Sequence, residues 1–328
     1  MISKLMKVEI NGRWIEERMM GMREDILVTR NLSKKYGNNT VVDNVNMTIK
    51  KGDIYGLVGK NGAGKTTIIR MILSLSKESS GEFKLFNATS EKEKLEKHGL
   101  VGSIVETPAF YPYLSAKQNL EYYRLQRGIV EKDAVDEALK FVGLEDVGNK
   151  KFKGFSLGMK QRLGLALAIM SNPDFLILDE PINGLDPMGI KEVRETLLKL
   201  NKVKNTTILI SSHILGELSQ LASCYGFIDD GKLIEEISSE ELLDKCKHCL
   251  AIKVDDLEKA SAILESKFKC ENYEVLNGNL IKIYDYLEES HIINKSFVEN
   301  GIMVYSLQKI GSNLEEYFLN LVGGEHNA

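Results

Sequence analysis

The sequence predicts an α/β fold over most of its length and a small α+β unit at its C-terminal end. A short apolar run, Ile54–Val58, leads through a glycine-rich turn into a helical pattern. Two further apolar runs, Phe175–Leu178 and Thr207–Ile210, end in polar residues, as buried strands do. After residue 241 the expected elements follow the order β-α-β-β-α-β. With 328 residues, 43% of them hydrophobic, the chain is long enough for two domains.

The turn after Val58 matches G-x-x-x-x-G-K-[ST], a pattern that holds phosphate groups. Its glycines bring backbone N–H groups close to phosphate oxygens, and the following helix directs the positive end of its dipole at the same anion. Lys65 is placed to reach the β- and γ-phosphates, and Thr66 to offer a hydroxyl to Mg²⁺. We therefore expect a P-loop NTPase core. The residues assigned to nucleotide binding are Gly59, Lys60, Asn61, Gly62, Ala63, Gly64, Lys65, Thr66 and Thr67.

The residues before this turn predict an antiparallel β subdomain. Ile26–Thr29 is expected to be an edge strand, and Lys34–Val42 a strand, a turn and a second strand. Tyr36 precedes the phosphate loop, and an aromatic ring there can stack on adenine, although alone it is more often an ordinary strand residue. Residues 1–24 show no clear period, and we expect a poorly ordered extension.

Helical patterns fill residues 105–165, which we interpret as a helical subdomain inserted into the core. A hairpin at Ser79–Asn87 and a charged helix near residues 90–97 are expected before it. Ser115 and Ser156 stand where N-cap residues belong, at the starts of two of the predicted helices.

The strand Phe175–Leu178 ends in two neighbouring carboxylates, Asp179 and Glu180. An apolar strand that carries Asp to Mg²⁺ is the second half of a P-loop ATPase site. Hydrolysis also needs a carboxylate that the metal does not consume, so these two residues can divide the roles. The strand Thr207–Ile210 ends in Ser-Ser and His213.

These motifs, in this order, resemble the ATP-binding subunit of ATP-binding cassette (ABC) transporters, from about Ile26 to Glu235. The resemblance implies a RecA-like core that hydrolyses ATP with Mg²⁺. It also implies a pair of ATP-binding subunits, here a homodimer, that drives separate membrane permease subunits from the cytoplasmic face of the membrane.

The resemblance assigns roles residue by residue. Tyr36 would stack on adenine, Thr66 and Asp179 would hold Mg²⁺, Glu180 would act as general base, and His213 would contact the γ-phosphate. Ser156 and Gly158 would bind ATP held by a second copy of the chain, and Asp186 would link the two copies.

Two departures from the family pattern matter. Where the family has Leu-Ser-Gly-Gly-Gln, this chain has Phe155-Ser156-Leu157-Gly158-Met159, so it lacks the Gln and any ribose contact that the Gln makes. Glu106 stands where the family usually has a Gln that donates an oxygen to Mg²⁺, and it keeps a hard oxygen ligand. An ordinary loop glutamate is the alternative. With its neighbours, Glu106 makes the chain similar to the bacitracin and lantibiotic (peptide antibiotic) resistance branch.

The chain after residue 240 forms a separate unit in this interpretation. Its pattern predicts a ferredoxin-like α+β domain over residues 241–328, following an ATP-binding domain over residues 25–240. Two strands flank Asn277-Gly278-Asn279, a strong hairpin signal. No catalytic cluster lies in it, so packing, dimer stabilisation and regulatory sensing all remain open.

Charge and composition bear on other classes of function. The net charge of −4 gives no sign of a nucleic-acid surface, and no apolar run approaches the roughly 18 residues that span a bilayer. Cys246 and Cys249 have metal or redox spacing without a second ligand pair, which favours unrelated thiols. The alternative function is a soluble cassette ATPase that acts on ribosomes or DNA. A P-loop kinase would leave Ser156, Gly158 and His213 unexplained.

Overall fold

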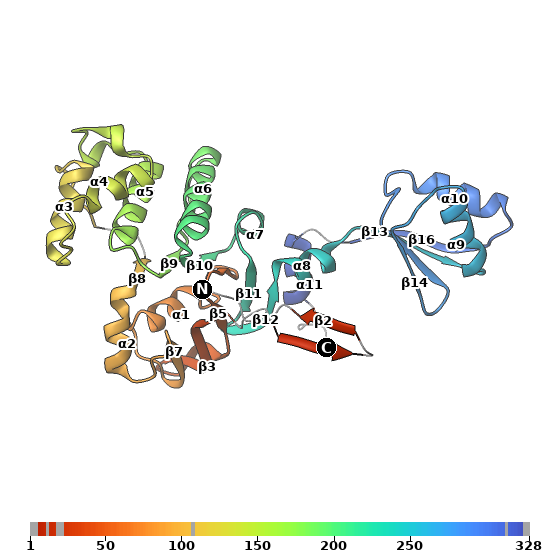
Figure 1. Ribbon diagram of the computed structural model, residues 1–328, viewed down its shortest axis with the longest axis horizontal. Helices are drawn as coiled ribbons and strands as arrows, with labels where there is room; N and C mark the ends of the chain where they lie inside the picture. The colour runs from red at the N-terminus through yellow and green to blue at the C-terminus, as the bar shows by residue number, and fades with distance from the viewer. Residues whose placement is uncertain (1–5, 11–12, 18–22, 106–108, 312–313, 324–328) are drawn as a thin grey trace. The chain divides into compact units, whose positions relative to one another are not determined.

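The protein is described by a computed structural model covering residues 6–10, 13–17, 23–105, 109–311 and 314–323. Its chain divides into two compact units, which are described separately (Figure 1). The first unit comprises Met1–Ile214 and Leu221–Glu236, and the second comprises Leu215–Gln220 and Ile237–Ala328.

A six-stranded sheet forms the centre of the first unit. Its strand order is β12 (Lys232–Ser238), β11 (Cys224–Asp229), β6 (Ile54–Val58), β10 (Thr207–Ser212), β9 (Phe175–Asp179) and β8 (Val101–Ile104). The strands from β11 to β8 are parallel, and every residue of β6 and β10 is buried. Because parallel strands end at the same edge of a sheet, the polar residues after β6, β9 and β10 lie close together.

The antiparallel sheet differs from the prediction at two places. Asp25–Tyr36 is one continuous strand, β3, which pairs with β4 (Asn39–Val45), β5 (Thr48–Lys50) and β7 (Ser80–Leu85). The predicted strand Ile26–Thr29 is present as part of β3, but its predicted edge position is wrong, because these residues pair with β5 on one side and with β7 on the other. The predicted hairpin at Ser79–Asn87 is wrong too, because β7 returns after α1 (Lys65–Ile72) to pair with β3, a long-range contact that local patterns do not show.

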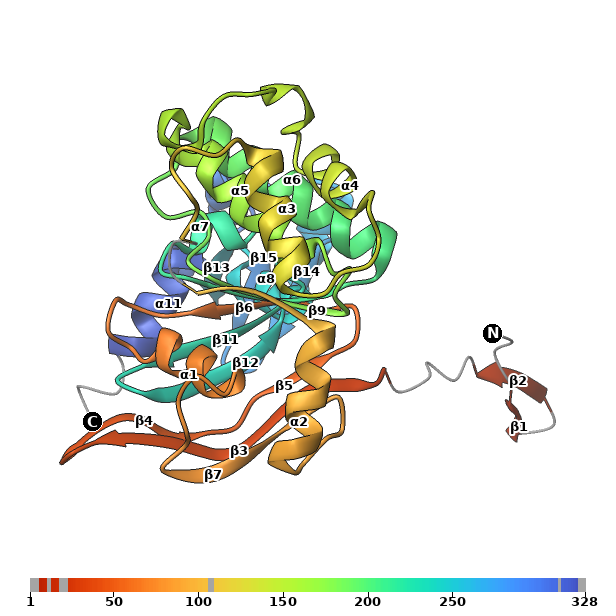
Figure 2. The same ribbon diagram turned by 90° about the vertical axis from the view of Figure 1, so that its left-hand side faces the viewer.

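Four helices of the first unit lie where the sequence pattern predicts helix: α2 (Glu91–Lys97), α3 (Ala116–Gln126), α4 (Ala134–Phe141) and α5 (Leu157–Ile169). Helix α6 (Pro187–Lys204) was not predicted. Ser115 caps α3, where its side chain accepts a hydrogen bond from the Gln118 N–H, and Ser156 caps α5 in the same way. Both ribbon views show α3, α4 and α5 together on one side of the six-stranded sheet, with β3 and β7 on the other (Figure 1 and Figure 2).

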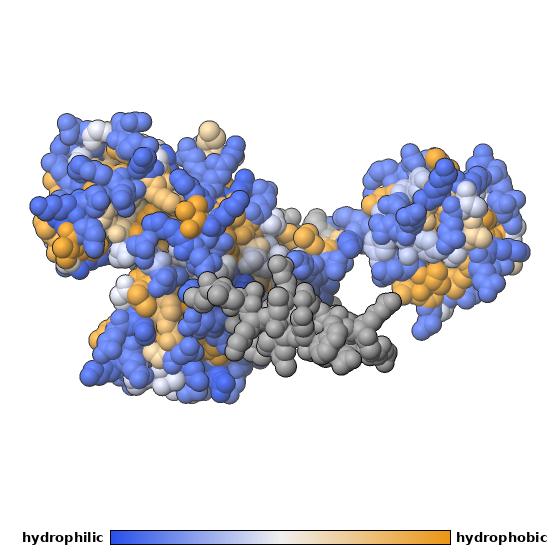
Figure 3. Space-filling model, viewed as in Figure 1, coloured by the Kyte–Doolittle hydropathy of each residue, from blue (hydrophilic) through white to orange (hydrophobic). Residues whose placement is uncertain are grey.

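The second unit has the predicted element order. Helix α7 (Leu215–Leu218) and helix α8 (Ser239–Cys246) precede β13 (Cys249–Val254), α9 (Leu257–Ser266), β14 (Tyr273–Leu276), β15 (Leu280–Ile283), α10 (Ser290–Glu299), β16 (Val304–Ile310) and α11 (Leu314–Gly323). The sheet order is β14-β15-β13-β16, with antiparallel neighbours. Figure 3 shows an apolar group on this unit where β14 lies, and the exposed residues of that strand include Val275 and Leu276.

In the N-terminal extension the structure describes two paired strands, β1 (Met6–Ile10) and β2 (Arg13–Glu17). The signal was present in the sequence, since residues 6–10 alternate between apolar and polar and Asn-Gly follows them. Across the described part of the chain, no helix combines the length and apolar character needed to cross a bilayer.

A tight contact between β6 and β11 provides a test of this packing. Tyr55 is fully buried, and a methyl group on Gly226 would overlap its hydroxyl and lie 2.9 Å from its Cζ. We expect Gly226→Ala to lower the free energy of unfolding by about 1–3 kcal/mol, because overpacking forces the neighbours apart. Urea titration measures this.

The control is Gly99→Ala, because a methyl group at Gly99 has nothing within 4 Å. Adding Tyr55→Phe to Gly226→Ala should recover part of the loss. Equal stability of the Gly226 and Gly99 variants would show that the strands are not packed as described.

Candidate active site

The phosphate loop joins the buried strand β6 to helix α1. Gly64 is the N-cap of α1, with φ at 104° and no side-chain cap, so the N–H groups of the first turn are available to an anion. A methyl group on Gly64 would lie 2.9 Å from the Val41 carbonyl oxygen, and one on Gly59 would overlap the Ile228 carbonyl oxygen. The loop therefore needs glycine at both positions, for conformation at Gly64 and for space at each.

Lys65 is the buried cation of the loop, with its side chain 4% exposed. Its ammonium group donates to the carbonyl oxygens of Gly59 at 2.7 Å and Lys60 at 3.1 Å. It also lies 3.2 Å from the Glu180 carboxylate. The positive charge of Lys65 is thus held next to the first turn of α1, whose backbone N–H groups are available to an anion.

Asp179 connects the loop to the ends of two strands. Its carboxylate accepts hydrogen bonds from the Thr66 hydroxyl at 2.7 Å and from the Ser211 hydroxyl at 2.6 Å. Two hard oxygens, Thr66 Oγ1 and Asp179 Oδ2, therefore stand side by side next to the phosphate loop, as the predicted metal ligands require.

Glu180 lies beyond Asp179 and faces both a cation and a histidine. Its Oε2 is 2.8 Å from His213 Nδ1, and its Oε1 faces Lys65. Its backbone φ is +46°, a conformation that is costly for a residue other than glycine. The Glu180 N–H donates to the Ser211 hydroxyl at 2.9 Å, which helps to hold this turn. A carboxylate that a histidine orients is suited to accept a proton from water.

The other predicted residues lie outside this cluster. Tyr36 ends β3 with half of its surface exposed, so its ring is accessible. Ser156 and Asp186 cap α5 and α6. Within the described ranges, no hydrogen bond or ion pair joins Ser156, Gly158 or Asp186 to Lys65, Asp179 or Glu180. Glu106 lies outside the described residues.

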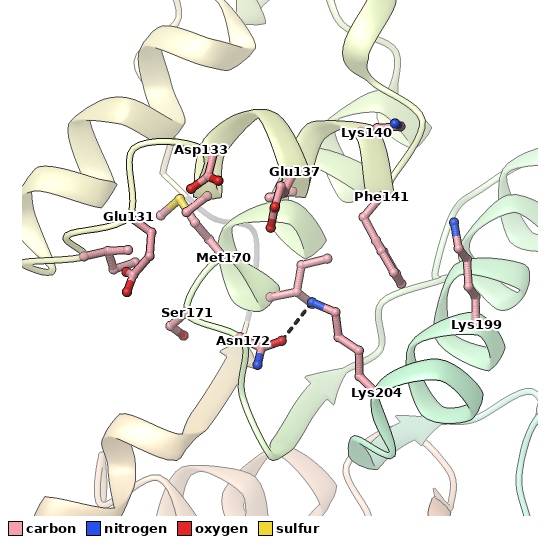
Figure 4. A pocket seen from close by; sticks show the side chains of 14 residues that line it. Glu131, Asp133, Glu137, Lys140, Phe141, Met170, Ser171, Asn172, Lys199 and Lys204 are labelled. Atoms are coloured by element: carbon pink, nitrogen blue, oxygen red, sulfur yellow. Dashed lines mark hydrogen bonds between the residues drawn. The ribbon is translucent and has the colours of Figure 1, made fainter.

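A cavity of about 720 Å³ lies apart from these residues, between α4, the end of α5 and α6. Figure 4 shows acidic side chains, among them Glu131 and Glu137, around one part of it and Lys199 and Lys204 around another. Lys204 donates to the Asn172 side chain at 2.8 Å. None of the predicted site residues lines this cavity, so it takes no part in the chemistry assigned above.

The four cysteines carry thiols rather than disulfides. Burial raises the pKa of Cys224 to about 12, and burial also raises the pKa values of Cys249 and Cys270. These three thiols are therefore protonated at neutral pH and poor nucleophiles. Among the described residues, no group of three or more His, Cys, Asp or Glu side chains is placed to hold a metal.

Comparison with known proteins decides the family. A family model described as ABC transporter matches residues 42–183. The bacitracin transport ATP-binding protein BcrA of Bacillus licheniformis is 46% identical over 299 residues, which are 91% of this chain and 98% of that protein. The chain belongs to the ATP-binding proteins of ABC transporters.

Other relatives agree with this membership. The lantibiotic transport ATP-binding protein SrtF of Streptococcus pyogenes is 44% identical over 64% of this chain and 90% of its own length. A dimeric ATP-binding cassette in a post-hydrolysis state with ADP and Pi has a TM-score of 0.58 and 25% identity, over 65% of this chain and 98% of that one. The predicted family, core fold and ATPase class are confirmed. Action on ribosomes or DNA is not favoured.

Sequence reasoning missed one residue of the cassette's site, Ser211. It is fully buried, and its hydroxyl both donates to Asp179 and accepts from the Glu180 N–H. A serine inside an otherwise apolar strand end was the available signal, because buried polar groups are normally hydrogen-bonded.

Removing this hydroxyl tests its role. We expect Ser211→Ala to lower kcat for ATP hydrolysis on the order of ten- to a hundredfold, because Asp179 and Glu180 lose the group that sets their positions. Steady-state phosphate release measures kcat, and a fluorescent nucleotide measures binding, which should change little. Ser212→Ala is the control, since among the residues that the structure describes the Ser212 hydroxyl bonds only to the Ile214 backbone. Equal losses in both variants would contradict the assignment.

Proposed function

We propose that two copies of this chain bind ATP between them and couple its hydrolysis to separate membrane permease subunits, which expel peptide antibiotics of the bacitracin or lantibiotic type. The names of the relatives BcrA and SrtF support the cargo class. The dimeric cassette of similar fold supports the pairing. The protein would then lie at the cytoplasmic face of the membrane, held there by the permease.

The arrangement of Glu180, His213 and Lys65 is the observation that carries the chemistry. Lys65, at the start of α1, would hold the β- and γ-phosphates of ATP. Glu180 would accept the proton of the attacking water, and His213, 2.8 Å from Oε2, would keep the carboxylate oriented and touch the γ-phosphate. Tyr36 would stack on the adenine, with its half-exposed ring.

Thr66 and Asp179 fit Mg²⁺, because this ion takes one or two hard protein oxygens and completes its shell with water and phosphate oxygens. When bound, Mg²⁺ neutralises charge that develops on the phosphates. Glu106 stays a predicted third ligand.

The second copy would supply the remaining contacts. Ser156 is exposed at the start of α5, and α5 has no acidic residue in its first turn, so this helix end favours an anion. Within its own chain Ser156 bonds only to the Met159 N–H among the described contacts. Ser156 and Gly158 would thus bind the γ-phosphate of ATP held by the partner, and Asp186 would join the two copies.

An exposed aromatic patch, Tyr111, Tyr113 and Tyr122, offers a surface for the permease. Tyr113 is 72% exposed, and the rings of Tyr111 and Tyr122 are 4.9 Å apart. Contiguous exposed patches of large apolar side chains mark interaction sites on protein surfaces. Tyr111 and Tyr113 lie between the segment that contains Glu106 and the start of α3, and Tyr122 lies within α3.

The catalytic proposal predicts that Glu180→Gln lowers kcat on the order of 100- to 10,000-fold, the usual contribution of a general base. Gln keeps the size of the side chain and its bond to His213 but cannot accept the proton. Glu195→Gln, at an exposed position on α6, is the matched control. Retained hydrolysis in Glu180→Gln would assign the general base elsewhere.

The cargo proposal predicts a gain of resistance. A bacitracin-sensitive Gram-positive host that expresses the chain with its permease should tolerate several times more bacitracin or lantibiotic, and Glu180→Gln should abolish the gain. Minimum inhibitory concentrations measure this. A functional ATPase that co-purifies with the permease but protects against neither antibiotic would rule out this cargo.

A further inference from the structure

Leu157 at the start of α5 and Leu185 in the loop that follows β9 each pack against a glycine of the other segment. A methyl group on Gly184 would lie 3.4 Å from Leu157 Cδ2, and a methyl group on Gly158 would lie 3.9 Å from Leu185 Cδ2. Each leucine therefore covers the glycine of the other segment. Leu157 is 46% exposed, so one side of it packs in this contact and the other faces solvent.

Gly184 and Gly158 make room for this contact in different ways. Gly184 has φ at +74°, a backbone conformation that is strained for residues with a side chain. Because Gly184 has no side chain, there is room for Leu157 to pack against it. Gly158 lies in the first turn of α5, directly after Leu157. The loop itself is closed by hydrogen bonds from the Asn183 N–H to the Glu180 carbonyl and from the Leu185 N–H to the Ile182 carbonyl.

A second contact joins α5 to α6, the helix that follows this loop. Arg162 of α5 lies 3.4 Å from the Glu192 carboxylate of α6, and the Arg162 side chain is only 17% exposed. Helix α6 begins directly after the loop, where the Asp186 carboxylate caps the Gly189 N–H at 3.2 Å. The leucines thus join the start of α5 to the loop before α6, and the ion pair joins α5 to α6 itself.

This contact matters because each segment carries a residue assigned to the second copy: Ser156 to its nucleotide, and Asp186 to the link between the copies. Ser156 immediately precedes Leu157, and Asp186 immediately follows Leu185. If the two segments moved independently, formation of the dimer would have to order both of them, and the loss of their conformational entropy would weaken the dimer. A fixed spacing also places donors within the narrow range that catalysis tolerates.

We propose that Leu157 is a positioning residue: packed on Gly184 while Leu185 packs on Gly158, it holds Ser156 and Asp186 as one rigid face that meets the second copy, with Ser156 at that copy's nucleotide. The proposal rests on the proposed function, since it needs the ATP-bound pair. It gives a role to the leucine that stands where the family pattern has glycine.

The test uses the full chain with Glu180→Gln, ATP and Mg²⁺, and measures the dimer dissociation constant by analytical ultracentrifugation. We expect Leu157→Ala to raise this constant about tenfold, equivalent to about 1.4 kcal/mol. Leu157→Met should restore it, because Met refills the contact. Leu198→Ala, an exposed leucine on α6, should leave it unchanged. The affinity of the single chain for ADP and the melting temperature should not change in any variant.

A double-mutant cycle separates positioning from direct contact with the partner. If the leucines act as one unit, Leu157→Ala with Leu185→Ala should match the weaker-binding single variant within about twofold. If the two single substitutions raise the dissociation constant by factors that multiply in the double variant, Leu157 contacts the partner by itself. If Leu157→Ala leaves the dissociation constant unchanged, Leu157 does not position the face. Either result overturns the proposal while leaving the proposed function intact. A parent Glu180→Gln chain that stays monomeric would overturn both.

Discussion

The carboxylate of Asp179 holds the site of this protein together. It accepts hydrogen bonds from Thr66 at the start of α1 and from Ser211 at the end of β10, while its own backbone ends β9. Three elements that are distant in the sequence are thereby fixed at one edge of the parallel sheet. Asp179 is partly buried, and a carboxylate withdrawn from water is costly without partners, so these bonds also favour a single arrangement of the loop and the strand ends.

The position of Glu180 depends on the hydrogen bonds that Asp179 and Ser211 make. Its left-handed backbone, at a cost of about 1–3 kcal/mol for such strained residues, turns the chain out of β9 and directs the side chain at His213 and Lys65. The strain falls on the residue proposed as general base, and the Ser211 hydroxyl helps to hold it. The same turn starts the loop that carries Gly184, Leu185 and Asp186. The segment from Glu180 to Asp186 therefore carries both the proposed general base of one copy and a residue proposed to contact the other copy.

Much of this could be predicted from the sequence, because the phosphate loop, the Asp179-Glu180 pair and His213 stand at the ends of apolar strands that leave little freedom in their placement. The pairing of β7 with β3 could not, since nothing in residues 79–87 indicates a partner some fifty residues earlier. Ser211 and Leu157 were also missed. The function of each depends on which side chain lies opposite, and that becomes visible only when strands and helices are packed.

The most direct measurement is a structure of the Glu180→Gln chain with ATP and Mg²⁺, in which the surroundings of the γ-phosphate are examined. The account predicts Lys65 and His213 of one copy on one side of that phosphate, and Ser156 and Gly158 of the other copy on the opposite side. A γ-phosphate contacted by one copy alone, with Ser156 of the second copy turned to solvent, would contradict the account.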